Sequence, residues 1–103
     1  MKHLLHTSIT LFVALTLASV TASADVQKGQ KLYIKKLKSV CKMTGSDFAA
    51  KHSQDEWETL YEAGKFNAEI NAICGTELEE KFLPHVYDFA YEYANDSGNV
   101  PSC

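Results

Sequence analysis

Three cysteines, Cys41, Cys74 and Cys103, lie in the last 79 residues of this 103-residue chain, and they constrain its fold more than any other feature. A domain of this size buries only a small core and often needs a disulfide or a metal for stability. An odd number of cysteines leaves one thiol free, paired with another chain or bound to a ligand. Which of these holds depends first on the compartment in which the chain folds.

The first 24 residues predict export. Lys2 precedes an apolar run over residues 9–20, and Ala22-Ser23-Ala24 has the form of a cleavage site, as in a secretory signal peptide. The run is shorter than the about 20 residues that span a bilayer. We therefore expect a signal peptide over 1–24, cleavage before Asp25, a periplasmic location where disulfides persist, and no membrane contact after cleavage.

The mature chain, residues 25–103, has helical patterns almost throughout and no strand pattern, which predicts one all-α domain of four to five helices. The first segment starts at Asp25 and carries one apolar stripe. Its members recur at three- and four-residue spacing: Gly29, Leu32, Tyr33, Leu37 and Val40. Gly45 interrupts this pattern, and we expect Ser46 or Asp47 to cap a short turn that contains Phe48.

Caps and stops mark the later helices. Ser53 and Glu56 have the spacing of a capping box, and Gly64 is a natural end for the helix that follows. Gly75 should end the next helix. Thr76 and Glu79 repeat the capping-box spacing, and Pro84 predicts the first turn of the last helix. Residues 95–103 are rich in turn-forming residues, which predicts an extended tail.

The cysteines flank these helices. Cys41 follows Val40 and Cys74 follows Ile73, so we expect both thiols to face the core and to form a disulfide. Pairing of Cys103 with either of the others is the alternative, because sequence does not fix connectivity.

Charge is distributed unevenly along the mature chain. Residues 25–42 hold six lysines and one acid, whereas residues 43–103 hold three lysines and twelve acids. The lysines fit either a solvated helix face or a docking surface for an acidic partner. The chain has no arginine, and the basic segment is short, so we expect no nucleic-acid binding.

Several stretches together resemble the small class I cytochromes c. They are the opening Gly29-Gln30-Lys31-Leu32-Tyr33, the segment Lys38-Ser39-Val40-Cys41-Lys42, the helix start Ser53-Gln54-Asp55-Glu56-Trp57, and the last helix with Leu83, Tyr87, Phe89, Ala90 and Tyr91. The resemblance implies a cytochrome c-like bundle whose first and last helices cross, haem c as cofactor, and electron transfer with a periplasmic redox partner. The chain departs from the family at the haem motif Cys-x-x-Cys-His, where Lys38 replaces the first cysteine and Lys42 the histidine.

If haem is retained, its candidate attachment point is Cys41, and the candidate axial ligands are Lys42, Met43, His52 and His85. The alternative is a haem-less, disulfide-stapled protein of the same fold that binds a partner in the periplasm. No cysteine pair has the spacing of a zinc site, and no nucleophilic or redox motif is present, so we expect neither a metal centre nor an enzyme.

Overall fold

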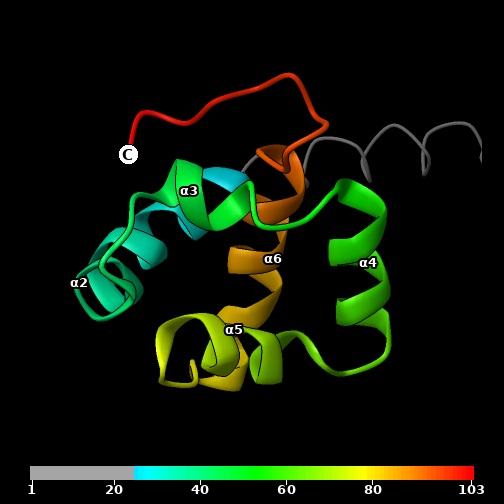
Figure 1. The fold of residues 1–103 in the computed structure, drawn as a ribbon. Coiled ribbons are helices and arrows are strands. Elements are labelled where there is room, and N and C mark those ends of the chain that lie inside the picture. The colour runs from blue at the N-terminus through cyan, green and yellow to red at the C-terminus, as the bar shows by residue number, and fades with distance from the viewer. Residues whose placement is uncertain (1–24) are drawn as a thin grey trace, which may run out of the picture.

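The computed structural model describes residues 25–103, which form an all-α bundle without strands in that range, as expected (Figure 1). The predicted signal peptide, 1–24, lies outside the described residues. The first helix starts with α-helical residues 25–32 and continues through a π-helical turn, η2. The remaining elements are η2 Tyr33–Leu37, α2 Lys38–Cys41, α3 Gly45–Ala49, α4 Gln54–Glu62, α5 Phe66–Cys74, the 3-10 turn η3 Glu80–Phe82 and α6 Leu83–Glu92.

The last helix is the centre of the bundle. Helices α3, α4 and α5 all contact α6, which runs through the middle of the view in Figure 1. The first helix crosses α6 at Gly29, whose Cα faces the backbone carbonyl of His85 and the side chain of Phe89. A glycine at this position lets the two helix backbones approach closely.

Most of the predicted helix ends form, and two of the predicted caps do not. Ser53 and Glu56 make the complete capping box at the start of α4, and the positive φ values of Gly64 and Gly75 end α4 and α5 as expected. The cap of α3 is Thr44, whose hydroxyl accepts from the Asp47 amide, and not Ser46 or Asp47. The side chain of Thr44 reaches this amide because α3 begins at Gly45, two or three residues earlier than predicted.

The capping box predicted at Thr76 is wrong. The side chain of Asn67 instead binds both backbone groups of Leu78, accepting from its amide and donating to its carbonyl, each at 2.8 Å. This bracket holds the segment after Gly75 in a non-helical conformation and buries Leu78. Pro84 lies in the first turn of α6, as predicted.

The π-helical turn η2 corrects the direction of the first helix. The backbone amide of Lys38, the residue after this turn, donates to the carbonyl of Tyr33, five residues earlier. Gly29, Tyr33, Leu37 and Cys41 are all four residues apart and all buried. In an α-helix four residues overshoot one turn by about 0.4 residue, so such a row drifts around the helix, and the wider π turn cancels part of that drift. The turn therefore keeps the whole row facing the core.

The core is a contiguous aromatic cluster. Tyr33 packs against Phe48 and Phe89, with ring centroids 5.1 and 5.8 Å apart, and Trp57 packs between Phe48 and Phe66, at 5.5 Å from each. These five side chains are at most 2% exposed. The indole N–H of Trp57, which burial would otherwise leave without a partner, donates to a backbone carbonyl in α3 at 2.9 Å. Side chains from every helix thus fill the centre of the bundle.

The tail, residues 95–103, lies along the bundle, as its path over α3 in Figure 1 shows. The amide of Asn95 donates to the carbonyl of His52, and Asp96 accepts from the amide of Gln54. At the other end, the Cys103 carbonyl accepts from the Ser46 amide, and Pro101 is buried. These contacts tie the C-terminus to the starts of α3 and α4. None of the helices between residues 25 and 103 is long and apolar enough to cross a membrane.

Candidate functional site

The disulfide predicted between Cys41 and Cys74 is present. It joins the end of α2 to the end of α5, and both residues are less than 9% exposed. Cys41 was expected to face the core because it follows the apolar Val40. Cys41 is buried, but Val40 is 47% exposed and does not belong to the buried stripe. The row that ends at Cys41 steps by four residues, which turns the residue before it toward solvent.

The two residues that follow Cys41 lie at the surface edge of this site. Lys42 is exposed and adopts a left-handed conformation with φ 57°, which ends α2. Met43 is half-buried against the core, and its carbonyl accepts from the Tyr33 hydroxyl at 2.8 Å. Burial, followed by the charges at Cys103 and Asp47, raises the pKa of Tyr33 to about 12, so this hydroxyl stays a donor. The segment is thereby fixed to the first helix.

His52 lies between α4 and α5. Its Nε2 is 2.7 Å from a carboxylate oxygen of Glu69, its Nδ1 is 3.3 Å from Glu56, and its ring meets Trp57 edge-on at 4.7 Å. Both ring nitrogens therefore have carboxylate partners. Hydrogen bonds from the Ser53 backbone and from His52 lower the pKa of Glu56, which favours its charged form. The arrangement is typical of a structural link between two helices.

His85 lies on the other helix pair, where α6 crosses the first helix. Its Nδ1 is 3.3 Å from a carboxylate oxygen of Asp25, although the geometry does not make a hydrogen bond and the nitrogen is buried. Burial, and then the neighbouring carboxylate of Asp25, raise the pKa of Asp88 on the next turn. His85 is thus part of an acidic contact at the start of the first helix.

These positions do not fit a haem attached through Cys41. The Cys41 sulfur is bonded to Cys74 and cannot form a thioether with a haem vinyl group. His52 and His85 belong to different helix contacts, each with its own carboxylate partner. The centre of the bundle is filled by the five aromatic side chains of the core. In the part of the chain that the structure describes, no group of three or more histidine, cysteine or acidic side chains could hold a metal ion.

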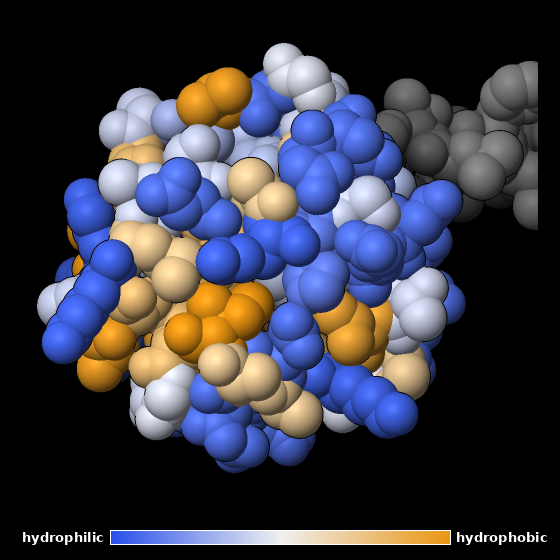
Figure 2. Space-filling view, in the orientation of Figure 1, coloured by the Kyte–Doolittle hydropathy of each residue, from blue (hydrophilic) through white to orange (hydrophobic). Residues whose placement is uncertain are grey.

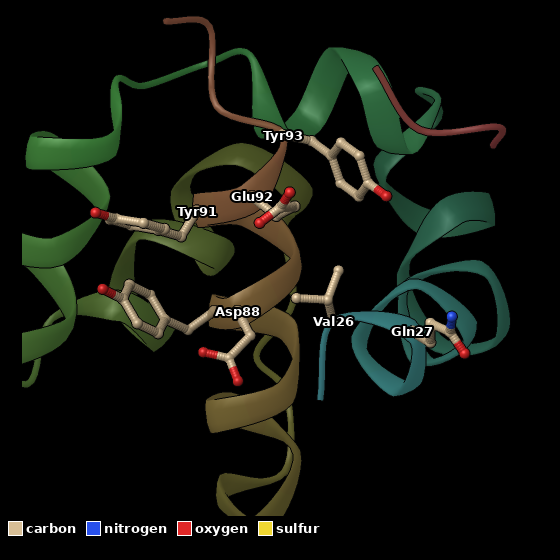
Figure 3. Close-up of a pocket in the computed structure, with 7 residues that line it drawn as sticks. Val26, Gln27, Asp88, Tyr91, Glu92 and Tyr93 are labelled. Atoms are coloured by element: carbon tan, nitrogen blue, oxygen red, sulfur yellow. The ribbon is translucent and has the colours of Figure 1, made fainter. Parts of the chain in front are cut away.

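An open groove runs along α6 beside the start of the first helix (Figure 3). It is lined by Val26, Gln27, Tyr87, Asp88, Tyr91, Glu92 and Tyr93. Figure 3 shows Tyr91 and Tyr93 pointing to opposite sides of α6, with the carboxylates of Asp88 and Glu92 between them. The rings therefore do not enclose a common space. Burial, and then the charge of Glu58, raise the pKa of Tyr87 to about 12, which keeps the phenol of Tyr87 neutral.

The lysine-rich segment forms an exposed face of the first helix. All six of its lysines are exposed, and among residues 25–103 none of these six has a carboxylate partner within ion-pair distance: Lys28, Lys31, Lys35, Lys36, Lys38 and Lys42. The ammonium group of Lys36 lies over the ring of Phe82, 5.7 Å from the ring centroid, so this lysine already makes one contact within the chain. In the view of Figure 2, hydrophobic residues reach the surface as separate patches among hydrophilic ones. A cationic face without internal partners is available to an external anion.

Sequence reasoning missed three features of the site. The π turn had a visible signal, because Gly29, Tyr33, Leu37 and Cys41 are evenly spaced by four. The carboxylate of Glu69 beside His52 and the bracket from Asn67 had no local signal, since each joins residues more than ten positions apart.

Comparisons with protein-family models, with curated proteins and with solved structures found no match to this chain.

Proposed function

We propose that this protein is a haem-less, disulfide-stapled accessory protein of the periplasm that binds an acidic partner protein and is not an enzyme. The observation that carries the proposal is the Cys41–Cys74 disulfide, because it uses the thiol that a c-type haem would need. Electron transfer through haem c, which the resemblance implies, would require that bond to be absent.

The disulfide also has a structural reason to exist in a haem-less domain. A mature chain of 79 residues has a small core, and a covalent link supplies stability that a bound haem would otherwise provide. The link joins the ends of α2 and α5, which are 33 residues apart in the chain. It therefore replaces part of the missing cofactor's role in holding helices together.

Binding to an acidic partner is supported by the lysine-rich face. Residues 26–42 carry six lysines and no acid, and the lysines are exposed. Positive charge concentrated on one element speeds association with a negative surface and orients the encounter. The remainder of the chain is acidic, so the face is polarised and not merely part of a cationic protein.

The test is a visible absorption spectrum of the protein purified from its native host, with a c-type cytochrome from the same host as the positive control. We expect no Soret band and no band after reduction, whereas the control shows both. A Soret band with sharp reduced bands at one haem per chain would overturn the haem-less function. The control excludes the trivial explanation that the host failed to supply haem.

A further inference from the structure

We infer that the partner docks in a hollow beside the π turn, and that the docking element is an acidic peptide segment with an aliphatic side chain. The hollow is about 490 Å³ and is lined by Ile34, Lys38, Ser39, Lys42, Met43 and Thr44; we call these residues the π-turn hollow. The inference rests on the proposed function in taking this chain to be a binding protein, and it adds where and what the chain binds.

The apolar part of the hollow is an exposed aliphatic side chain. Ile34 is 43% exposed and is one of three large hydrophobic residues that the described chain leaves exposed, with Val40 and Val100. It follows the buried Tyr33 by one residue, so it lies on the flank of the buried row. Val40 precedes Cys41 by one residue and lies on the opposite flank, outside the hollow.

The polar part of the hollow is cationic. Lys38 lies one turn beyond Ile34, and Lys42 one turn further, so one side of the helix presents an aliphatic group and two ammonium groups. Thr44 and Ser39 add hydroxyls. Neither lysine has a carboxylate partner among residues 25–103. Charge complementarity therefore selects a ligand with carboxylates on one side of an apolar group.

The floor of the hollow is rigid, which favours a specific ligand. The Tyr33 hydroxyl donates to the Met43 carbonyl at 2.8 Å and approaches that of Thr44 at 3.3 Å. The adjacent Cys41 is fixed to α5 by its disulfide. A preformed site loses little conformational entropy on binding, so a small contact area can still give measurable affinity.

A protein segment fits this surface better than a membrane does. Helices that lie on membranes insert a broad apolar face that carries several large side chains. Here the exposed part of the first helix offers Ile34 and Val40 on opposite flanks, and neither is more than half exposed. One aliphatic side chain beside two lysines matches a single anchor residue of a peptide.

The probe for the test is a synthetic peptide with one leucine next to a run of four aspartates, and its matched control replaces leucine with serine. We expect the full-length exported protein to bind the leucine peptide about tenfold more tightly than the serine peptide, by titration calorimetry at about 0.05 M salt. Raising the salt to about 0.5 M should weaken binding of both peptides, because the screening length falls to a few ångströms.

Matched variants of the protein locate the site. Ile34→Ser should remove the preference for leucine, whereas Val40→Ser, at a similarly exposed position on the other flank, should retain it. Lys38→Gln should lower the affinity for the leucine peptide about fivefold. Lys28→Gln removes the same charge elsewhere on the helix and should change the affinity less than twofold. All four positions are exposed, so the fold should be unaffected, which circular dichroism checks.

Four outcomes would overturn the inference. Equal affinity for the two peptides, or equal effects of Lys38→Gln and Lys28→Gln, would show binding to charge alone. Stronger binding to vesicles with anionic lipids than to the peptide would assign the surface to a membrane. Sedimentation that shows concentration-dependent self-association, lost in Ile34→Ser, would assign it to a second copy of this chain. None of these results depends on the haem spectrum, so each proposal can fail without the other.

Discussion

Substitution of Gly29 by alanine tests the crossing of the first and last helices. A β-carbon built at Gly29 would collide with the backbone carbonyl oxygen of His85, and it would lie 2.7 Å from that carbonyl carbon and 2.9 Å from the Phe89 Cβ. The first two atoms belong to the backbone and cannot rotate away. The helices must therefore separate, and the aromatic contact between Tyr33 and Phe89 loosens with them.

Two opposing effects set the magnitude. Alanine is a better helix former than glycine by about 1 kcal/mol, which favours the variant. Overpacking usually costs about 1–3 kcal/mol and can cost more against a fixed backbone. We expect the collision to dominate, with a net loss of about 2 kcal/mol in the free energy of unfolding. For a domain of this size that corresponds to a fall of roughly 10 °C in Tm.

The assay is urea unfolding followed by circular dichroism, with the disulfide intact in both proteins. Lys28→Ala is the matched control, since this neighbour is exposed and lysine and alanine have similar helix propensity. It should change stability by less than about 0.5 kcal/mol. If Gly29→Ala were as stable as the parent protein or more stable, helix propensity would have decided the outcome and the close crossing would be refuted.

Three further variants test the disulfide, the core and the acidic contact. Replacing Cys41 and Cys74 together by alanine should lower the free energy of unfolding by about 4 kcal/mol in urea, from the loop of 33 residues that the bond closes; a loss below about 1 kcal/mol would contradict the role given to the bond. Trp57→Phe removes a buried donor and part of the core, so thermal unfolding should show a loss of about 2–3 kcal/mol, and an unchanged Tm would place this ring outside the core. Folding raises the pKa of Asp88, so the parent protein should lose stability as the pH rises through that pKa. Asp88→Asn should therefore be more stable than the parent at neutral pH and as stable as the parent at strongly acidic pH. A stability difference that stays constant across pH would refute this prediction.

Local signals in the sequence predicted much of the fold. Ser53 with Glu56, Gly64, Gly75 and Pro84 mark helix ends through contacts within a few residues, and the structure has each of them. The capping box at Thr76 had the same spacing and failed, because the distant Asn67 binds Leu78 and holds that segment away from helical geometry. Long-range partners of this kind leave no pattern in the local sequence.

The disulfide was predictable in outcome but not in detail. The pairing was inferred from apolar neighbours, and Val40 proves to be exposed. A fixed α-helical period places Val40 on the buried stripe, whereas the π turn moves the inward row to Leu37 and Cys41. The hollow beside Ile34 lies next to the same turn. A regular α-helix assumed over this segment therefore predicts neither the exposure of Val40 nor the hollow.

The central claim is that Cys41 is a disulfide cysteine and not a haem-attachment cysteine. Proteolytic mapping without reduction, by mass spectrometry of protein purified from the native host, tests it most directly. The account predicts one linked peptide pair that contains Cys41 and Cys74, a separate peptide with Cys103, and no peptide that carries the mass of haem. A Cys41 peptide with the mass of haem, or one linked to Cys103, would contradict it.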